Sequence, residues 1–326
     1  MTQANQNLAA ASYRGKHFTM PELNSQGAVY LRPKLKGPGT GPKSIIVPEQ
    51  HPIITSLNKP FDVREFLTPR TPISLGFLNG RERMAFHPGL PRTLDLPVQF
   101  PGSELRLPGN LARLAPLLQR ILNYEARINP NCREEYYIYL TVDQGWVKPG
   151  KLQREAPCHV DGFQGGRWNP KVRANHTYTV CDILPTVYYP QPFDLLALDE
   201  NKHNFFWEMN RQVWETNSEF AWRAQPGELT LMDCYCVHRG DEADVEVFRT
   251  FIRVSFEVRI FDRKGNAHNP LFAYDWPMVP RDIEGLNLVP FNASGDPSLF
   301  VFPWQQVDGT AHDDPKARTK PVLKRS

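Results

Sequence analysis

The sequence has few cysteines, and none of them are paired at zinc-finger or redox spacing. Five occur in 326 residues. The count is odd and no Cys-x-x-Cys motif is present, so neither a disulfide framework nor a zinc finger is indicated. This usage favours a reducing, cytoplasmic compartment. The cysteines are Cys132, Cys158, Cys181, Cys234 and Cys236.

Long apolar runs and a strong charge of one sign are also missing. No window reaches the ~18 apolar residues of a membrane span, and the polar segment 1–12 lacks the apolar region of a signal peptide. We therefore expect no membrane partner. Lys and Arg number 38 against 35 Asp and Glu, a net charge of +3. So mild an excess does not demand a nucleic-acid partner.

Proline, by contrast, is frequent, with 31 residues in the chain, about twice the usual share. Prolines interrupt helices and punctuate loops, which argues against an all-helical chain. The hydrophobic content of 40% is enough for a sizeable core. We interpret the chain as one domain, 1–326, with an extended N-terminal arm (1–60), flanking strands and helix (61–133), a β-rich core (134–262) and a C-terminal extension (263–326).

The segment 110–125, which precedes the β-rich core, has apolar residues at the spacing of a helix. Asn110 is a suitable N-cap for it, and Pro116 indicates a kink or a later helix start. We interpret its apolar stripe as core packing without a chemical role. The stripe follows the i, i+3, i+4, i+7, i+8 spacing that predicts one apolar face, as Leu114, Leu117, Leu118, Ile121 and Leu122.

From about residue 134 the hydrophobic period changes to two. Short strand-like runs separated by Gly, Pro, Asn and Asp clusters are typical of a sandwich or barrel of jelly-roll type. A polar and aromatic segment at 199–216 suits a helical insert. The strand-like runs cover 137–142, 176–180, 186–189, 228–232 and 249–261.

The segment 156–162 holds His159 and Asp161, which are one residue apart. On a strand, residues i and i+2 point to the same face, so an imidazole and a carboxylate would project together. Cys158 and Val160 suit the opposite, buried face, and a glycine-containing loop follows. His-x-Asp by itself is common, and taken alone it indicates only a surface pair.

His238 supplies a third candidate ligand. It follows a Pro226-Gly227 turn, an apolar strand and Asp233, a layout that returns a jelly-roll strand to the mouth of a barrel. Two neutral imidazoles and one carboxylate on one face of an octahedral metal leave three positions open. That is the facial triad of non-haem Fe(II) oxygenases.

The run after His238 alternates between two faces, and one of these would bury two arginines. An arginine inside a barrel is costly unless an anion pairs with it. A dicarboxylate co-substrate that chelates the metal would place its far carboxylate against one guanidinium. The alternative is a solvent-facing strand with Arg–Glu pairs. The core face carries Thr250, Ile252, Val254, Phe256 and Val258, and the other face carries Arg249, Phe251, Arg253, Ser255 and Glu257.

These motifs resemble the Fe(II)/2-oxoglutarate-dependent dioxygenase superfamily, and no subfamily is identified. The resemblance implies a mainly β fold with flanking helices and a double-stranded β-helix (jelly-roll, cupin-like) core. It implies Fe(II) as the metal, 2-oxoglutarate as co-substrate and O2 as oxidant, with succinate and CO2 released. It covers about 130–262 and rests on His159, Asp161, His238, Arg249 and Arg253-x-Ser255.

The resemblance leaves the 2-oxoglutarate arginine open. Arg253-x-Ser255 resembles the Arg-x-Ser pair of one branch. Arg249 is closer to the spacing of the taurine-dioxygenase-like branch, where a second arginine four residues on can hold an anionic substrate. The hydroxyl of Tyr139 is a candidate contact for the co-substrate carboxylate, with ordinary sheet packing as the alternative. Asp161 stands where related halogenases have a small residue, which favours hydroxylation, desaturation or cyclisation.

Substrate contacts are expected from the loop after the metal motif. Gln164, Arg167 and Trp168 suit a small polar substrate such as an amino acid, a nucleoside or a natural-product intermediate. Arg167 and Trp168 could instead anchor the loop. His176 and His203 are expected to be structural.

Two other functions stay open at this stage. A nucleic-acid or protein demethylase of the same superfamily would need a basic groove around the mouth, and no interleaved basic and aromatic residues surround the motif. A non-catalytic jelly-roll binding module has no need of a co-substrate anion clamp, so Arg249 and Arg253 argue against it. The sequence assigns no oligomeric state.

Overall fold

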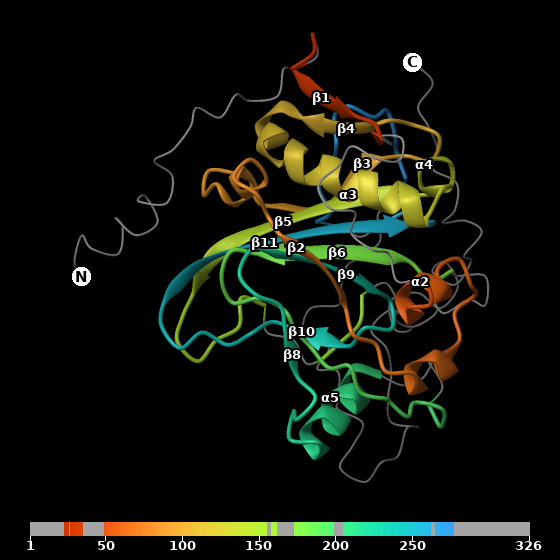
Figure 1. Cartoon of the computed structure of the whole chain (residues 1–326). Coiled ribbons are helices and arrows are strands. Elements are labelled where there is room, and N and C mark those ends of the chain that lie inside the picture. The colour runs from red at the N-terminus through yellow and green to blue at the C-terminus, as the bar shows by residue number, and fades with distance from the viewer. Residues whose placement is uncertain are drawn as a thin grey trace.

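Figure 1 shows the computed structural model of the chain, which describes residues 23–25, 27–34, 49–154, 158–161, 173–198, 205–261 and 265–276. The strands are β1 (Ala28–Leu31), β2 (Ile73–Phe77), β3 (Thr93–Gln99), β4 (Leu105–Pro108), β5 (Tyr137–Val147), β6 (His176–Cys181), β7 (Val187–Tyr188), β8 (Trp222–Arg223), β9 (Glu228–Asp233), β10 (His238–Arg239) and β11 (Val247–Glu257). The helices are α2 (Pro52–Ser56), α3 (Ala115–Ile128), α4 (Cys132–Glu135) and α5 (Phe205–Glu215), with 3-10 helices η1 (Val63–Leu67), η2 (Glu82–Phe86) and η3 (Gly109–Leu114).

Antiparallel pairing joins the described strands into three sheets. The largest has the order β2-β9-β6-β11-β5-β3, a smaller one has the order β10-β7-β8, and β1 pairs with β4. In Figure 1, α3 lies on one side of the large sheet, and β10, β8 and α5 lie on the other. The predicted β-rich fold with flanking helices is confirmed.

The two longest strands, β5 and β11, form the centre of the large sheet and orient the arginines. They pair in register over eleven residues each, from Tyr137↔Glu257 to Val147↔Val247. The side chains of Ile252, Val254 and Phe256 are buried in the core cluster that includes α3, as the alternation predicts. Because neighbouring strand residues point to opposite faces, the arginines of β11 lie on the side of the small sheet.

Helix α3 begins later than its capping signal suggests. It starts at Ala115 with Pro116 in its first turn, where the missing N–H of proline costs nothing. Asn110 lies in η3, and the N-cap of α3 is Leu114, without a side-chain hydrogen bond. Of the two alternatives at Pro116, a kink or a later start, the later start is confirmed, and the Asn110 cap is wrong. The apolar stripe packs in the core as Leu114, Leu117, Leu118, Ile121 and Leu122.

A buried polar network ties α3 to the sheet at Glu125, which is fully buried. Its carboxylate accepts hydrogen bonds from Tyr178 Oη at 2.6 Å and Asn129 Nδ2 at 3.0 Å, and lies 3.0 Å from His176 Nδ1. The other ring nitrogen of His176 lies 3.1 Å from the Ile53 carbonyl. Burial lowers the pKa of His176. The charge and hydrogen bond of Glu125 raise it by more than burial lowers it, so the pKa lies above its usual value. His176 is thus a structural residue, as expected.

Helix α5 lies within the predicted insert at 199–216, while His203 lies outside the described residues, as do most of the N-terminal arm and the C-terminal extension. All five cysteines are free and buried. No helix in the described part of the chain has the length and apolar character to cross a membrane.

Candidate metal centre

His159 and His238 are brought together by backbone hydrogen bonds. The N–H of each donates to the carbonyl of the other at 2.9 Å, forming an antiparallel bridge. The two imidazole rings therefore lie side by side, with centroids 4.6 Å apart. His238 belongs to β10, but His159 lies in an isolated bridge and Asp161 in a bend, so the predicted strand at the His-x-Asp motif is reduced to this one bridge.

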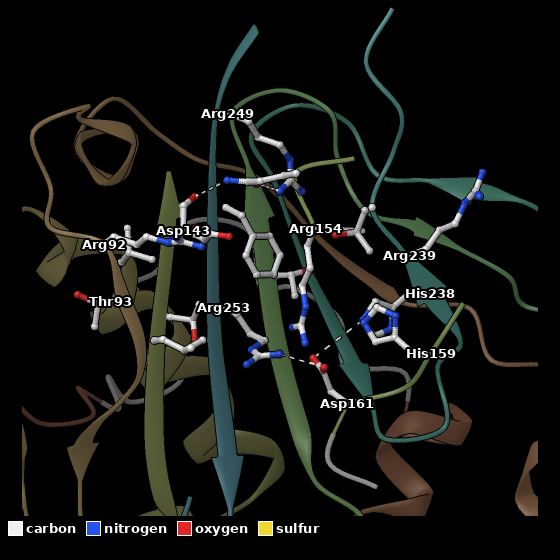
Figure 2. Close-up of a pocket in the computed structure, with 18 of the residues that line it drawn as sticks. Arg92, Thr93, Asp143, Arg154, His159, Asp161, His238, Arg239, Arg249 and Arg253 are labelled. Atoms are coloured by element: carbon white, nitrogen blue, oxygen red, sulfur yellow. Dashed lines mark hydrogen bonds and ion pairs between the residues drawn. The ribbon is translucent and has the colours of Figure 1, made fainter. Parts of the chain in front are cut away.

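The side chain of Asp161 completes a three-residue cluster with the two histidines. One ligand atom from each residue lies within 4.8 Å of the others, and Asp161 Oδ2 is 4.0 Å from His238 Nε2. Figure 2 shows the carboxylate directed toward the two imidazoles. Two imidazoles and one carboxylate fit the donor set of a facial triad for Fe(II).

The protonation state of His238 suits a metal ligand. Its Nδ1 lies 2.9 Å from the Cys236 carbonyl, an acceptor that places the ring proton on Nδ1. Nε2 then keeps its lone pair and faces Asp161, an arrangement that histidine ligands commonly share. Burial lowers the pKa of His238 more than Asp161 raises it, so the ring is neutral at pH 7.

Asp161 is held as a carboxylate by its cationic neighbour. Arg253 Nη1 donates to Asp161 Oδ1 at 2.9 Å. Burial raises the pKa of Asp161, but attraction to Arg253, His238 and His159 outweighs burial and holds the pKa well below its usual range. The carboxylate is therefore ionised at neutral pH.

Arg253 bridges two carboxylates. Its Nη2 donates to Asp95 Oδ1 at 2.7 Å, and Thr141 Oγ1 donates to the same oxygen at 3.1 Å. Asp95 is buried on β3 with a positive φ of 47°, a conformation that costs most residues free energy. Sequence reasoning missed Asp95, although a carboxylate within the apolar run 94–98 was a visible signal.

Arg249 is also buried, but its contacts are neutral. Its Nε donates to the carbonyls of Ile183 and Leu184, its Nη1 to the Gln153 side chain, and its Nη2 to Cys181 Sγ. It makes no ion pair with any residue that the structure describes. The nearby carboxylate of Asp182 accepts the backbone N–H of Thr250 instead, at 2.7 Å.

The triad lies at one wall of a cavity of about 580 Å³ that also contains both arginines of β11. Three further arginines line it and are labelled in Figure 2. These are Arg92, Arg154 and Arg239. A cavity with so many cations suits anionic ligands.

Other predicted contacts lie away from this cavity. The Tyr139 hydroxyl donates to the Arg259 carbonyl at 3.0 Å and accepts the N–H of Phe261 at 2.9 Å, and its ring belongs to a separate aromatic cluster. Ser255 Oγ accepts a hydrogen bond from Thr177. Neither side chain lines the cavity, because the pair Tyr139↔Ser255 lies two residues from the pair Thr141↔Arg253, toward the Tyr137↔Glu257 end of the two strands. The predicted contact of Tyr139 with a co-substrate is therefore not supported.

The predicted substrate residues fall outside the part of the chain that is described. These are Gln164, Arg167 and Trp168, and their roles stay predictions.

Glu257 makes stability depend on pH. It is buried on the face of β11 turned away from α3, and burial, as the main cause, raises its pKa from 4.5 to about 7. The folded state thus binds this proton more tightly than the unfolded state does. Its contribution to stability is complete below pH 4.5 and is lost as the pH rises through about 7.

We therefore expect Glu257→Gln to flatten this pH dependence. The variant should be more stable than the wild type at pH 8, by about 2–3 kcal/mol, and similar to it at pH 5. Urea denaturation at a series of pH values measures this difference. Parallel curves for the two proteins would contradict the assignment.

No protein-family model and no curated protein sequence matches the chain. Solved structures with partial similarity include EvdMO1, at 16% identity and a TM-score of 0.22, over 37% of this chain and 26% of that one. EvdO2 from Micromonospora carbonacea var. aurantiaca, complexed with 2-oxoglutarate, matches at 13% identity and a TM-score of 0.30, over 56% and 76%. EctD from S. alaskensis, in its apoform, matches at 15% identity and a TM-score of 0.32, over 74% and 89%.

The chain thus spans about a quarter of the length of EvdMO1. Because the three TM-scores are all low, the interpretation of the site depends on its own geometry.

Proposed function

We propose that the protein is a non-haem Fe(II)/2-oxoglutarate-dependent oxygenase that oxidises a small polar metabolite and releases succinate and CO2. The observation that carries this proposal is the convergence of His159, Asp161 and His238 at one wall of an arginine-lined cavity. The reaction would be hydroxylation, desaturation or cyclisation of an amino acid, a nucleoside or a natural-product intermediate. The position of β10 and β8 on the side of the large sheet opposite α3 supports a double-stranded β-helix core at 134–262 within a single domain.

The triad would hold Fe(II) through His159, His238 Nε2 and the Asp161 carboxylate. Bound iron and 2-oxoglutarate would supply the oxidising chemistry, with O2 as the oxidant. The residues of the chain orient the metal ligands. The Cys236 carbonyl sets the tautomer of His238, and Arg253 holds one oxygen of Asp161 so that the other faces the histidine. Such outer contacts fix ligand geometry and tune metal affinity.

Arg249 is the better candidate for the distal carboxylate of 2-oxoglutarate. Arg253 is already neutralised by Asp161 and Asp95, whereas Arg249 is a buried cation with neutral partners. A buried guanidinium favours a carboxylate strongly, because the ion pair offsets the cost of burying the charge. Arg253 is then assigned a different role, which is to position the metal ligand Asp161.

Anaerobic titration with Fe(II) and 2-oxoglutarate, followed by succinate measurement after O2 is admitted, tests the function. An oxygenase forms succinate in proportion to the O2 consumed. A binding module would bind the metal without forming succinate, and that result would refute the proposal. A demethylase would turn over only with a methylated nucleic acid or protein.

Substitution of the two arginines separates their roles. We expect Arg249→Gln to weaken 2-oxoglutarate binding about a hundredfold, because it removes the partner of a buried carboxylate, while Fe(II) binding is retained. Arg253→Gln should weaken Fe(II) binding about tenfold through loss of Asp161 orientation, with less effect on 2-oxoglutarate. Calorimetric titration of each ligand measures both effects. Equal effects of the two substitutions on 2-oxoglutarate would contradict the assignment.

A further inference from the structure

The charges that line the cavity do not balance. Among the described lining residues, five are arginines and three are aspartates, and two of the aspartates are paired with arginines of the lining. Arg92 Nε lies 2.7 Å from Asp143, and Arg253 is paired with Asp161. The third aspartate, Asp241, is paired with Arg223, which does not line the cavity.

Three arginines of the lining therefore have no carboxylate partner among the described residues, and two of these three are unsuited to bind the substrate. Arg249 is the proposed partner of 2-oxoglutarate. The guanidinium of Arg239 points away from the triad in Figure 2. Arg154 is the third. It is exposed and makes no hydrogen bond or ion pair with any residue in the described ranges.

The position of Arg154 directs its charge at the reacting region. It lies on the segment between β5 and His159, and its guanidinium extends toward Asp161 in Figure 2. Arg154 thus acts on the space in front of the triad.

The proposed function leaves this charge uncompensated when the site is loaded. The charges of Fe(II), the dianion of 2-oxoglutarate, Asp95, Asp161, Arg249 and Arg253 then sum to zero. Arg154 then contributes an excess positive charge in the cavity, on the side of Asp161. A cation in a walled cavity raises the local concentration of anions and is stabilised by one.

We propose that Arg154 binds an anionic oxyacid group, such as a carboxylate, phosphate or sulfate, on the substrate. This assignment rests on the proposed function and narrows the substrate class from polar metabolites to anionic ones. Arg154 is then a specificity-determining residue, which steers the anionic end of the substrate so that the rest of the molecule faces the triad.

The test uses the full chain loaded with Zn(II) and saturating 2-oxoglutarate, titrated calorimetrically with inorganic phosphate, sulfate and acetate at constant ionic strength. We expect at least one of these anions to bind, and its affinity to fall about tenfold in Arg154→Gln and to be kept in Arg154→Lys. Arg92→Gln is the matched control, since Arg92 is an exposed arginine of the same cavity already paired with Asp143. It should bind the anion as the wild type does. The anion preferred, phosphate, sulfate or acetate, identifies the group on the substrate.

Two outcomes would overturn the assignment. One is that none of the three anions binds to the wild type. The other is an anion affinity that is unchanged in Arg154→Gln, including binding that is lost only in Arg249→Gln, which reports the co-substrate site. Binding of 2-oxoglutarate, measured separately on each variant, distinguishes these outcomes from failure of the proposed function. If 2-oxoglutarate does not bind, the same titrations in an Arg249→Gln background still test Arg154.

Discussion

Replacement of Asp161 by alanine is expected to abolish Fe(II) binding and turnover while the fold is retained. The carboxylate is the one anionic ligand of the triad, and its Oδ2 lies 4.0 Å from His238 Nε2. Without it, two neutral imidazoles would have to hold a divalent cation beside Arg253 and Arg154. We expect the loss of metal affinity to exceed the roughly hundredfold that removal of an outer contact costs. Anaerobic Fe(II) titration and succinate formation measure the effect.

Asp143→Ala is the matched control for this experiment. Asp143 is an aspartate of the same cavity, but it is paired with the exposed Arg92 and does not belong to the metal cluster. It should bind iron as the wild type does, and the circular dichroism of both variants should match the wild type. An iron-loaded and active Asp161→Ala protein would contradict the ligand assignment.

Glu125→Ala is expected to destabilise the fold by about 3–5 kcal/mol, the range for breaking a buried charged pair. The substitution leaves three buried groups without their acceptor, namely His176 Nδ1, Tyr178 Oη and Asn129 Nδ2. It also removes the carboxylate that raises the pKa of His176, so burial would lower that pKa and favour the neutral ring. Urea denaturation at pH 7 measures the free energy of unfolding.

Glu134→Ala, at an exposed position of α4, is the surface control and should change stability by less than about 0.5 kcal/mol. Glu125→Gln retains the volume and one oxygen acceptor, so its effect should lie between the two. A Glu125→Ala protein as stable as the Glu134→Ala control would show that the network contributes nothing to folding.

The contrast between Glu125 and its helix shows where periodicity loses information. The stripe from Leu114 to Leu122 was correctly predicted to be core, because apolar spacing records which face of a helix is buried. Glu125 lies on that same face and is buried as well. Its partners come from β6 and the end of α3, so only the packed structure shows that a carboxylate is satisfied there. Similarly, Asn110 has the chemistry of a cap but lies in η3, since Pro116 set the start of α3.

The residue types of the candidate site could be predicted from the sequence, but the ion pairs and hydrogen bonds between them could not. The alternation on β11 placed both arginines on one face, and the structure leaves Arg249 with neutral partners and Arg253 between two carboxylates. One of those carboxylates, Asp95, comes from β3, whose register with β5 is shifted by a bulge. No spacing rule within β11 could have shown this contact.

The sequence by itself determined the candidate ligand types, the apolar face of the helix and the alternating faces of β11, since these follow from residue chemistry and local periodicity. The tertiary structure alone decided which charges meet. The bridge between His159 and His238, the position of Asp95 beside Arg253 and the lack of a partner for Arg154 among the described residues all depend on segments distant in the chain. The free energy of a charge depends on the groups within a few ångströms of it, and the order of residues does not record those distances.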